Sequence, residues 1–325
     1  MGESPQGAGR RGGRPNSAVR SRSAVSPFAG EEAGAREQPY SLRRPDRLSS
    51  GVVFSSPHSG RAYFSDFIGA SRLDLRRLRA SEDAYVDRLF ATAADFGAPV
   101  LSAVAPRAFV DLNRCPDDLD PSLLDGAAKR PANARVAAGL GVVPRIVAEG
   151  VSIYDGKLSL EEAKARIRHW HAPYHARLAQ LLSVARRRFG EALLIDCHSM
   201  PSGAVALSHR RGSPVDVVLG DRFGASASKH HINAIEAAFA DAGFRVERNA
   251  PFAGGYITER FGRPQSGVSA IQIEIDRGLY LDQSRVAPSV EFDRFIASLR
   301  PVIRQICALV VEVSAGYEPP PLAAE

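Results

Sequence analysis

The chain has 325 residues, of which 44% are hydrophobic and 24% are charged, a composition typical of a soluble globular protein. No apolar run reaches the ~18 residues that a membrane-spanning helix needs, so we expect no membrane partner. The three cysteines, Cys115, Cys197 and Cys307, have no paired spacing, which excludes a disulfide framework and favours a reducing, cytoplasmic location.

The formal charge of +6 is concentrated near the N-terminus. Residues 1–50 contain nine arginines and no lysine against five acidic residues, a balance of +4 that leaves the remainder at about +2. Residues 1–48 are rich in Arg, Gly, Ser and Pro and have no periodic apolar face, so we predict a disordered tail. The nearly neutral remainder indicates no nucleic-acid partner for the folded part.

Strands and helices alternate after this tail. Ser81 can cap a first helix, and Ser159 with Glu162 forms a capping box for a second, long helix that Pro173 should kink. Between the two lies an irregular stretch, residues 115–155, long enough to indicate a functional loop. The elements predicted in this half are strands at 51–57, 98–104 and 108–113 and helices at 81–97 and 159–188.

The second half continues the alternation. It predicts strands at 192–197, 215–220, 244–248 and 269–275 and helices at 224–241 and 289–314. The pattern predicts a single α/β domain at 49–317, followed by a C-terminal tail at 318–325. We expect a three-layer αβα sandwich with a mostly parallel or mixed central sheet.

Titratable side chains collect where the predicted strands end. His58 follows the first strand, Asp196 and His198 close the strand at 192–197, and Glu274 closes the strand at 269–275. Ligands of open α/β sheets bind beyond the carboxyl ends of the strands, so these groups are candidates for one crevice. Two histidines and a carboxylate suffice for a catalytic zinc site, and a further carboxylate can serve as general base. Arginines near other strand ends could hold an anionic substrate; they are Arg107, Arg114 and Arg277.

Six segments between residues 51 and 282 extend this pattern over most of the chain. They are FSSPHSGRAYF, EDAYVDRLF, RAFVDLNR, IRHWHAPYHARL, LLIDCHSMPSG and GGYITERFGRPQSGVSAIQIEIDRGLYLD. In this order they resemble the N-formylglutamate amidohydrolase family, which is similar in fold and site to zinc carboxypeptidases and aspartoacylases. The resemblance implies a zinc-carboxypeptidase-like fold and one Zn²⁺ per chain. It also implies hydrolysis of N-formyl-L-glutamate to formate and L-glutamate, in histidine catabolism.

The resemblance also implies roles for individual residues. His58 and His198 match the histidine ligands of the metal, and Glu274 matches the general base. Arg107 is then expected to polarise the scissile carbonyl. Apart from the resemblance, Asp196 is expected to orient His198 or a nearby backbone group.

Substrate-binding roles are implied in the same way. Asn113 and Arg114, in the segment DLNR, match an Asn-Arg pair that holds a substrate carboxylate in carboxypeptidases. N-formylglutamate has two carboxylates, so we expect a second cation in the pocket, either Arg145 or Arg277. The expected partner is therefore a small anionic substrate.

The third metal ligand departs from the related pattern. Carboxypeptidases have a carboxylate ligand three residues after the first histidine, and Arg61 occupies that place here. The nearest acidic residues in a suitable context are Glu82 and Asp83. We favour Asp83 and keep Glu82 as the alternative.

Two other functions stay open. A related hydrolase of another N-acyl amino acid or a small peptide could use the same scaffold, because the loops at 115–155 and 250–267 set the size of the acyl pocket. A non-catalytic polyanion-binding protein could use the basic tail at 1–48. The sequence does not indicate an oligomeric state.

Overall fold

The computed structural model describes residues 1–2, 38–128, 133–147, 150–204 and 215–312. The C-terminal tail predicted at 318–325 lies outside these residues, and so does most of the tail predicted at 1–48, together with the polyanion-binding function assigned to it. No helix in the described part of the chain is long and apolar enough to cross a membrane.

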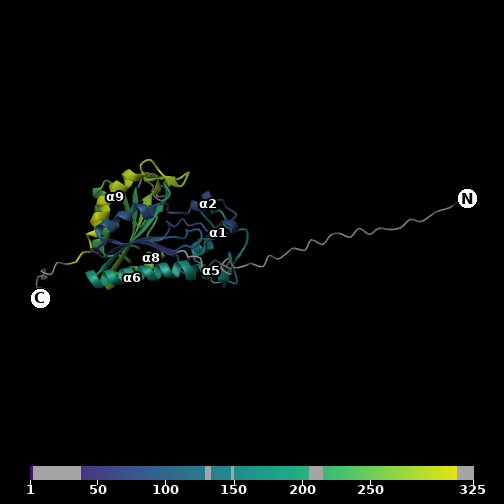
Figure 1. The fold of residues 1–325 in the computed structure, drawn as a ribbon, viewed down its shortest axis with the longest axis horizontal. Helices are drawn as coiled ribbons and strands as arrows, with labels where there is room; N and C mark the ends of the chain where they lie inside the picture. The colour runs from purple at the N-terminus through teal and green to yellow at the C-terminus, as the bar shows by residue number, and fades with distance from the viewer. Residues whose placement is uncertain (3–37, 129–132, 148–149, 205–214, 313–325) are drawn as a thin grey trace. The chain divides into compact units, whose positions relative to one another are not determined.

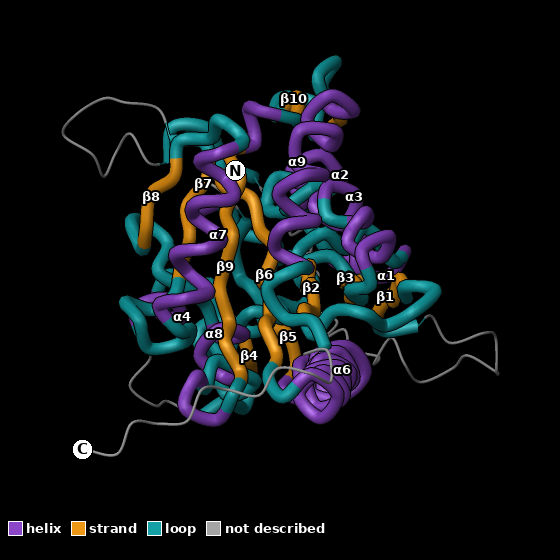
Figure 2. The backbone as a smooth tube through the Cα atoms, turned by 90° about the vertical axis from the view of Figure 1, so that its left-hand side faces the viewer, coloured by secondary structure: helices purple, strands orange, loops and turns teal. Residues whose placement is uncertain are grey.

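A seven-stranded mixed sheet forms the middle layer of the described structure (Figures 1 and 2). The strand order is β1-β3-β2-β6-β9-β7-β8. The four central strands β3, β2, β6 and β9 are parallel, whereas β1 is antiparallel to β3 and β7 is antiparallel to β9. The bounds are β1 Tyr40–Arg43, β2 Val52–Ser56, β3 Val100–Ala103, β6 Ala192–Met200, β7 Val217–Gly220, β8 Val246–Arg248 and β9 Val268–Asp276. The predicted mixed sheet is confirmed.

Helices cover both faces of this sheet, which confirms the α/β sandwich. Helices α6 (Ala172–Phe189) and α8 (Tyr256–Phe261) pack on one face, and α9 (Phe292–Cys307) lies on the other, as Figure 1 shows. Helix α9 contacts α7 (Lys229–Asp241). The remaining elements are α1 Ser65–Ala70, α2 Leu75–Arg79, α3 Val86–Leu89, α4 Ala134–Ala137, α5 Leu160–Arg166, β4 Leu124–Asp125, β5 Leu158–Ser159, β10 Leu281–Asp282 and β11 Ala287–Pro288.

The sequence patterns explain the principal elements. All nine residues of β6 are buried, as expected for an apolar strand covered on both faces. The Ser159 hydroxyl accepts a hydrogen bond from Glu162 N at 3.1 Å, so the predicted cap of α5 is confirmed. The long helix is divided where predicted: a π-helical segment, Ile167–His171, separates α5 from α6, and Pro173 lies in the first turn of α6.

Three local predictions differ from the structure. The helix predicted at 81–97 begins only at Val86, because Tyr85 has a left-handed backbone (φ 64°) that interrupts it. The predicted disordered tail at 1–48 is too long, since Tyr40–Arg43 pairs with β3 as an edge strand. The strand predicted at 108–113 is irregular, because side chains and not a neighbouring strand satisfy its backbone carbonyls.

Three basic side chains hold this irregular segment, residues 107–114. His175 Nε2 donates to Leu112 O at 2.8 Å, and His171 Nε2 donates to Arg114 O at 2.9 Å. Arg166, fully buried in α5, donates from Nη1 to Phe109 O at 3.1 Å and stacks its guanidinium 4.1 Å from the Phe109 ring centroid. The segment is therefore fixed against α5 and α6.

Replacing Arg166 with methionine should lower the free energy of unfolding by about 3 kcal/mol, because Glu162 and the Tyr154 hydroxyl lose a buried cationic partner. The matched control is Lys164→Met, whose exposed pair with Glu161 should contribute less than about 0.5 kcal/mol. Urea unfolding followed by circular dichroism measures both variants. Equal stability of the two variants would show that Arg166 does not hold the segment.

Candidate active site

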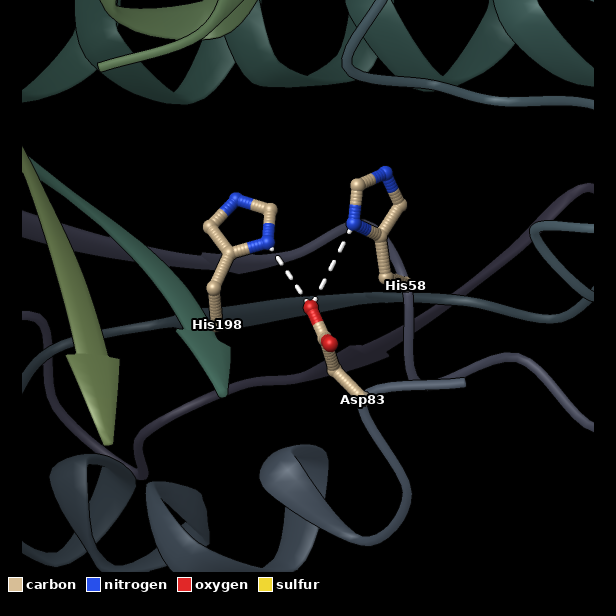
Figure 3. Close-up of side chains that lie close together, drawn as sticks. All are labelled: His58, Asp83 and His198. Carbon is tan, nitrogen blue, oxygen red and sulfur yellow. Dashed lines mark hydrogen bonds and ion pairs between the residues drawn. The ribbon is translucent and has the colours of Figure 1, made fainter. Parts of the chain in front are cut away.

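Three buried side chains from separate parts of the chain meet at the carboxyl end of the sheet. His58 follows β2, Asp83 lies in the turn before α3, and His198 lies near the end of β6. Their potential ligand atoms all lie within 4.8 Å of one another. Figure 3 shows Asp83 Oδ2 between the two rings, 2.9 Å from His198 Nδ1 and 3.3 Å from His58 Nδ1.

The backbone brings these residues together. Strand β2 pairs with β6 with Ser55 opposite Asp196, so the loop that follows β2 passes beside the end of β6. Asp83 N donates to His58 O at 3.0 Å, which ties the turn before α3 to that loop. Gly60 lets the loop pass close to its neighbour, because a Cβ atom there would lie 2.0 Å from Ala105 O.

Asp83 and Glu82, the two candidates for the third ligand, have different side-chain partners. Glu82 is buried, but its Oε1 accepts hydrogen bonds from the Tyr63 hydroxyl at 2.7 Å and from Arg79 Nε at 3.0 Å. Only Asp83 faces the two histidines. Arg61, in the place of the carboxypeptidase carboxylate, forms two 3.0 Å hydrogen bonds with Asp87 instead.

Each histidine ring also contacts a second carboxylate through Nε2, the ring nitrogen that does not face Asp83. His58 Nε2 lies 2.7 Å from Asp111 Oδ1, and His198 Nε2 lies 3.0 Å from Asp196 Oδ2. Both aspartates are buried, and Asp111 also accepts a 3.0 Å hydrogen bond from Arg107 Nε. A carboxylate next to Nε2 favours a proton on that nitrogen and leaves Nδ1, which faces Asp83, free to bind a metal.

The donor set fits a metal ion. His58 Nδ1 is buried without a hydrogen-bond partner in the described structure, although it faces the same point as His198 Nδ1 and Asp83 Oδ2. A buried polar atom without a partner is costly, and a bound cation would relieve that cost. Two imidazole nitrogens and one carboxylate oxygen are the ligand set of catalytic zinc sites that keep a further position open.

Charges inside the cluster shift its pKa values in opposite directions. Burial alone would raise the pKa of Asp83, but the hydrogen bond with His198 and the nearby imidazole of His58 outweigh it and hold that pKa well below its usual range. Burial alone would lower the pKa of His198, whereas Asp196 raises it well above 6.5, with a further contribution from Asp83. The carboxylate of Asp83 therefore stays ionised in the folded protein.

Glu274 lies beside this cluster. It is opposite His198 in the register of β6 and β9, and both residues line the same cavity. Burial raises the pKa of Glu274 to about 7, because the nearby charges of His198, Arg107 and Arg277 only partly compensate and Asp83 adds to the increase. Its Oε1 accepts a 2.9 Å hydrogen bond from Gln272 Nε2. A carboxyl with such a pKa is suited to accept and donate protons near neutral pH.

The cavity in front of these groups has a volume of about 510 Å³. Arg107, Asn113, Arg114 and Arg277 line it, as expected from the sequence. Parts of both predicted loops also line it, including Leu140, Ile146, Phe252 and Gly254. Among the described residues Arg145 does not line the cavity, because its guanidinium pairs with the buried Asp120 at 2.8 Å.

Two of the predicted substrate-binding residues are already engaged by protein groups. Asn113 Nδ2 donates to Asp196 Oδ2 at 3.2 Å and lies 3.1 Å from His198 Nε2, while its Oδ1 accepts from Ile257 N at 2.7 Å. Arg277 donates to Asp83 Oδ1 at 2.9 Å and to Ser199 Oγ at 3.1 Å. These contacts hold Asn113 and Arg277 against the cluster, and both side chains also line the cavity, so their role in substrate binding stays a prediction.

Comparison with known proteins shows the family of this chain. A family model described as N-formylglutamate amidohydrolase matches residues 50–281, which is more than half of the chain. The chain belongs to the N-formylglutamate amidohydrolase family. A curated relative from Pseudomonas aeruginosa, named N-formylglutamate deformylase, is 30% identical over 258 residues, covering 78% of this chain and 90% of the relative.

Further relatives agree with this family assignment. A relative of the same name from Pseudomonas putida is 31% identical over 236 residues, covering 72% of this chain and 82% of its own. A crystal structure of N-formylglutamate amidohydrolase from Ralstonia eutropha JMP134 matches with a TM-score of 0.78 and 33% identity, covering 84% of this chain and 98% of that one. The family and the fold inferred from the sequence are confirmed.

Some residues of this amidohydrolase site were not assigned a function from the sequence. Gln272 lies two positions before Glu274 on β9, and the two-residue period of a strand puts both on one face. Asp111 lies within the strand predicted at 108–113, but its contact with His58 depends on the irregular path of residues 107–114. Arg135, which also lines the cavity, lies in the irregular stretch at 115–155, where no periodicity indicates the direction of a side chain.

Replacing Asp83 with asparagine should weaken metal binding by more than about 100-fold, because the cluster loses its only negative ligand group and its hydrogen bond from Arg277 is weakened. The matched control, Glu82→Gln, should retain the metal, since the adjacent side chain points away from both histidines. Metal content after gel filtration, measured by elemental analysis, distinguishes them, with circular dichroism to verify folding. Loss of metal from Glu82→Gln and not from Asp83→Asn would reverse the assignment.

Proposed function

We propose that this chain is a zinc-dependent N-formylglutamate deformylase, which hydrolyses N-formyl-L-glutamate to formate and L-glutamate. The observation that carries the proposal is the buried cluster of His58, Asp83 and His198 next to a carboxyl with a raised pKa, in a member of this family. The names of the two curated relatives support the substrate.

The residues of the site divide the reaction between them. His58, Asp83 and His198 would hold one Zn²⁺ ion, which when bound supplies a Lewis acid for water activation and carbonyl polarisation. Glu274 accepts a proton from the attacking water as the C–O bond forms at the formyl carbon. It then donates that proton to the leaving nitrogen as the C–N bond breaks, which yields formate and the free amino group.

Arginines supply the remaining charge. Arg107 lines the cavity and donates a hydrogen bond to Asp111, which supports the proposal that its guanidinium stabilises negative charge on the formyl oxygen in the transition state. Arg114 is buried at the cavity wall and is proposed to bind a substrate carboxylate. Asn113, Asp196 and Asp111 position the two histidines and do not contact substrate in this proposal.

The purified protein should release formate from N-formyl-L-glutamate, lose this activity on chelation and regain it when Zn²⁺ is added. A series of formyl-, acetyl- and propionyl-L-glutamate tests the acyl group, and the formyl compound should have the highest kcat/KM. Bound metal with faster turnover of a larger acyl group would assign the related N-acyl hydrolase function instead. Folded protein that binds no metal would overturn the mechanism.

Replacing Glu274 with glutamine should lower kcat by about 10²- to 10⁴-fold, because the variant cannot accept the proton of the attacking water. Metal content should be unchanged. The matched control is Asp276→Asn on the same strand, which does not line the cavity and should keep kcat within about 2-fold. A Glu274→Gln enzyme with full kcat and bound metal would assign the general base to another group.

A further inference from the structure

Of the residues that the structure describes, four arginines line the cavity, and only two of these four are closely paired with carboxylates. Arg107 forms an ion pair with Asp111 at 3.0 Å, and Arg277 forms one with Asp83 at 2.9 Å. The aspartates of both pairs also contact the histidines, Asp111 at His58 and Asp83 at His198. The other two arginines, Arg114 and Arg135, are therefore the cations left for an anionic ligand.

Arg114 is nearly buried and only loosely compensated. Its Nε donates to Leu140 O at 3.0 Å and its Nη1 donates to Asn113 O at 3.2 Å. The nearest carboxylate, Asp111, is 3.9 Å from Nε and already bound to Arg107 and His58. Within the described structure, Arg114 Nη2 has no hydrogen-bond acceptor. A buried guanidinium in this state is poised for an incoming carboxylate.

Arg135 reaches the same cavity from helix α4, whose first turn is capped by Asn133. It is exposed, and its guanidinium forms no hydrogen bond or ion pair with the described residues. Leu140 connects it to Arg114: Leu140 N donates to Arg135 O at 2.8 Å, and Leu140 O accepts from Arg114 Nε. Burial lowers the pKa of Arg114, and the positive charge of Arg135 contributes to the decrease.

The two arginines lie at different depths relative to the reacting groups. Arg114 is buried and lies 3.9 Å from Asp111, which contacts His58 directly, whereas Arg135 lines the cavity as an exposed residue. In an N-acyl amino acid the α-carboxylate is adjacent to the scissile amide, and a side-chain carboxylate is several bonds further away. The buried Arg114 therefore suits the α-carboxylate, and the exposed Arg135 suits the side-chain carboxylate.

We propose that Arg135 binds the side-chain carboxylate of the substrate and so determines the preference of this site for acidic N-acyl amino acids. This inference rests on the proposed function, and it replaces Arg145 and Arg277 as the expected second cation. A carboxylate there would relieve the repulsion between Arg135 and Arg114 and form charge-assisted hydrogen bonds with a rigid guanidinium.

The test compares N-formyl-L-glutamate with N-formyl-L-glutamine, which has the same shape but no side-chain charge. In Arg135→Gln, kcat/KM for the glutamate compound should fall by about 30-fold, mainly through KM, while the glutamine compound changes by less than about 3-fold. The matched control is Arg304→Gln, an exposed arginine on α9, which changes the net charge equally and should alter neither value. An equal loss for both compounds, or an undiminished preference for glutamate, would overturn the role of Arg135.

A binding measurement separates this proposal from the proposed function. Calorimetry with glutarate and with its monoamide requires no turnover, and Arg135→Gln should lose affinity for glutarate alone. If the wild type releases no formate from either substrate, but Arg135→Gln binds glutarate more weakly than the wild type and the monoamide equally well, the deformylase function fails and the subsite stands. If it releases formate and Arg135→Gln binds glutarate as tightly as the wild type, the deformylase function stands and the subsite fails.

Discussion

The structure of the site depends on one buried carboxylate, that of Asp83. It is almost completely removed from water, and it stays ionised only because His58, His198 and Arg277 surround it. An unpaired charge at this depth would cost several kcal/mol, so the loop after β2, the turn before α3 and the end of β6 are constrained to meet. The same constraint gathers two imidazole nitrogens and an anionic oxygen around one point, which is the arrangement that a divalent cation needs.

A second layer of contacts makes that arrangement rigid. Asp111 and Asp196 hold Nε2 of the two rings, and Asn113 joins β6 to the N-terminus of α8 by contacting Asp196 and Ile257. Two of these three residues come from the irregular segment at 107–114, which is fixed by buried basic side chains of α5 and α6. Side chains held in this way need little reorganisation when metal or substrate binds, which favours catalysis by preorganised charges.

The distribution of charge separates the groups proposed for proton transfer from those proposed for anion binding in one cavity. Arg107 and Arg277 are paired with the aspartates that surround the histidines, so they stabilise the cluster more than they attract a ligand. Arg114, at the end of the segment at 107–114, and Arg135, in the irregular stretch at 115–155, also line the cavity and are paired with carboxylates less closely or, among the described residues, not at all. Burial keeps Glu274, adjacent to His198 on the neighbouring strand, from ionising easily, so the proposed proton transfer and the proposed anion binding involve separate groups of one cavity.

The sequence by itself determined the family, through the resemblance of six segments, and most strands of the sheet, because apolar periodicity is a local property. The predicted strand ends also place His58, His198 and Glu274 at one edge. The sequence could not separate Asp83 from Glu82, since adjacent residues differ only in the direction that a strained turn at Tyr85 gives them. It also predicted a strand at 108–113, where apolar residues instead form a loop whose carbonyls accept hydrogen bonds from Arg166 and His175. Only the tertiary structure decided these points and the pairing of Arg145 with Asp120 outside the cavity, because each depends on contacts between residues that are separated in the chain.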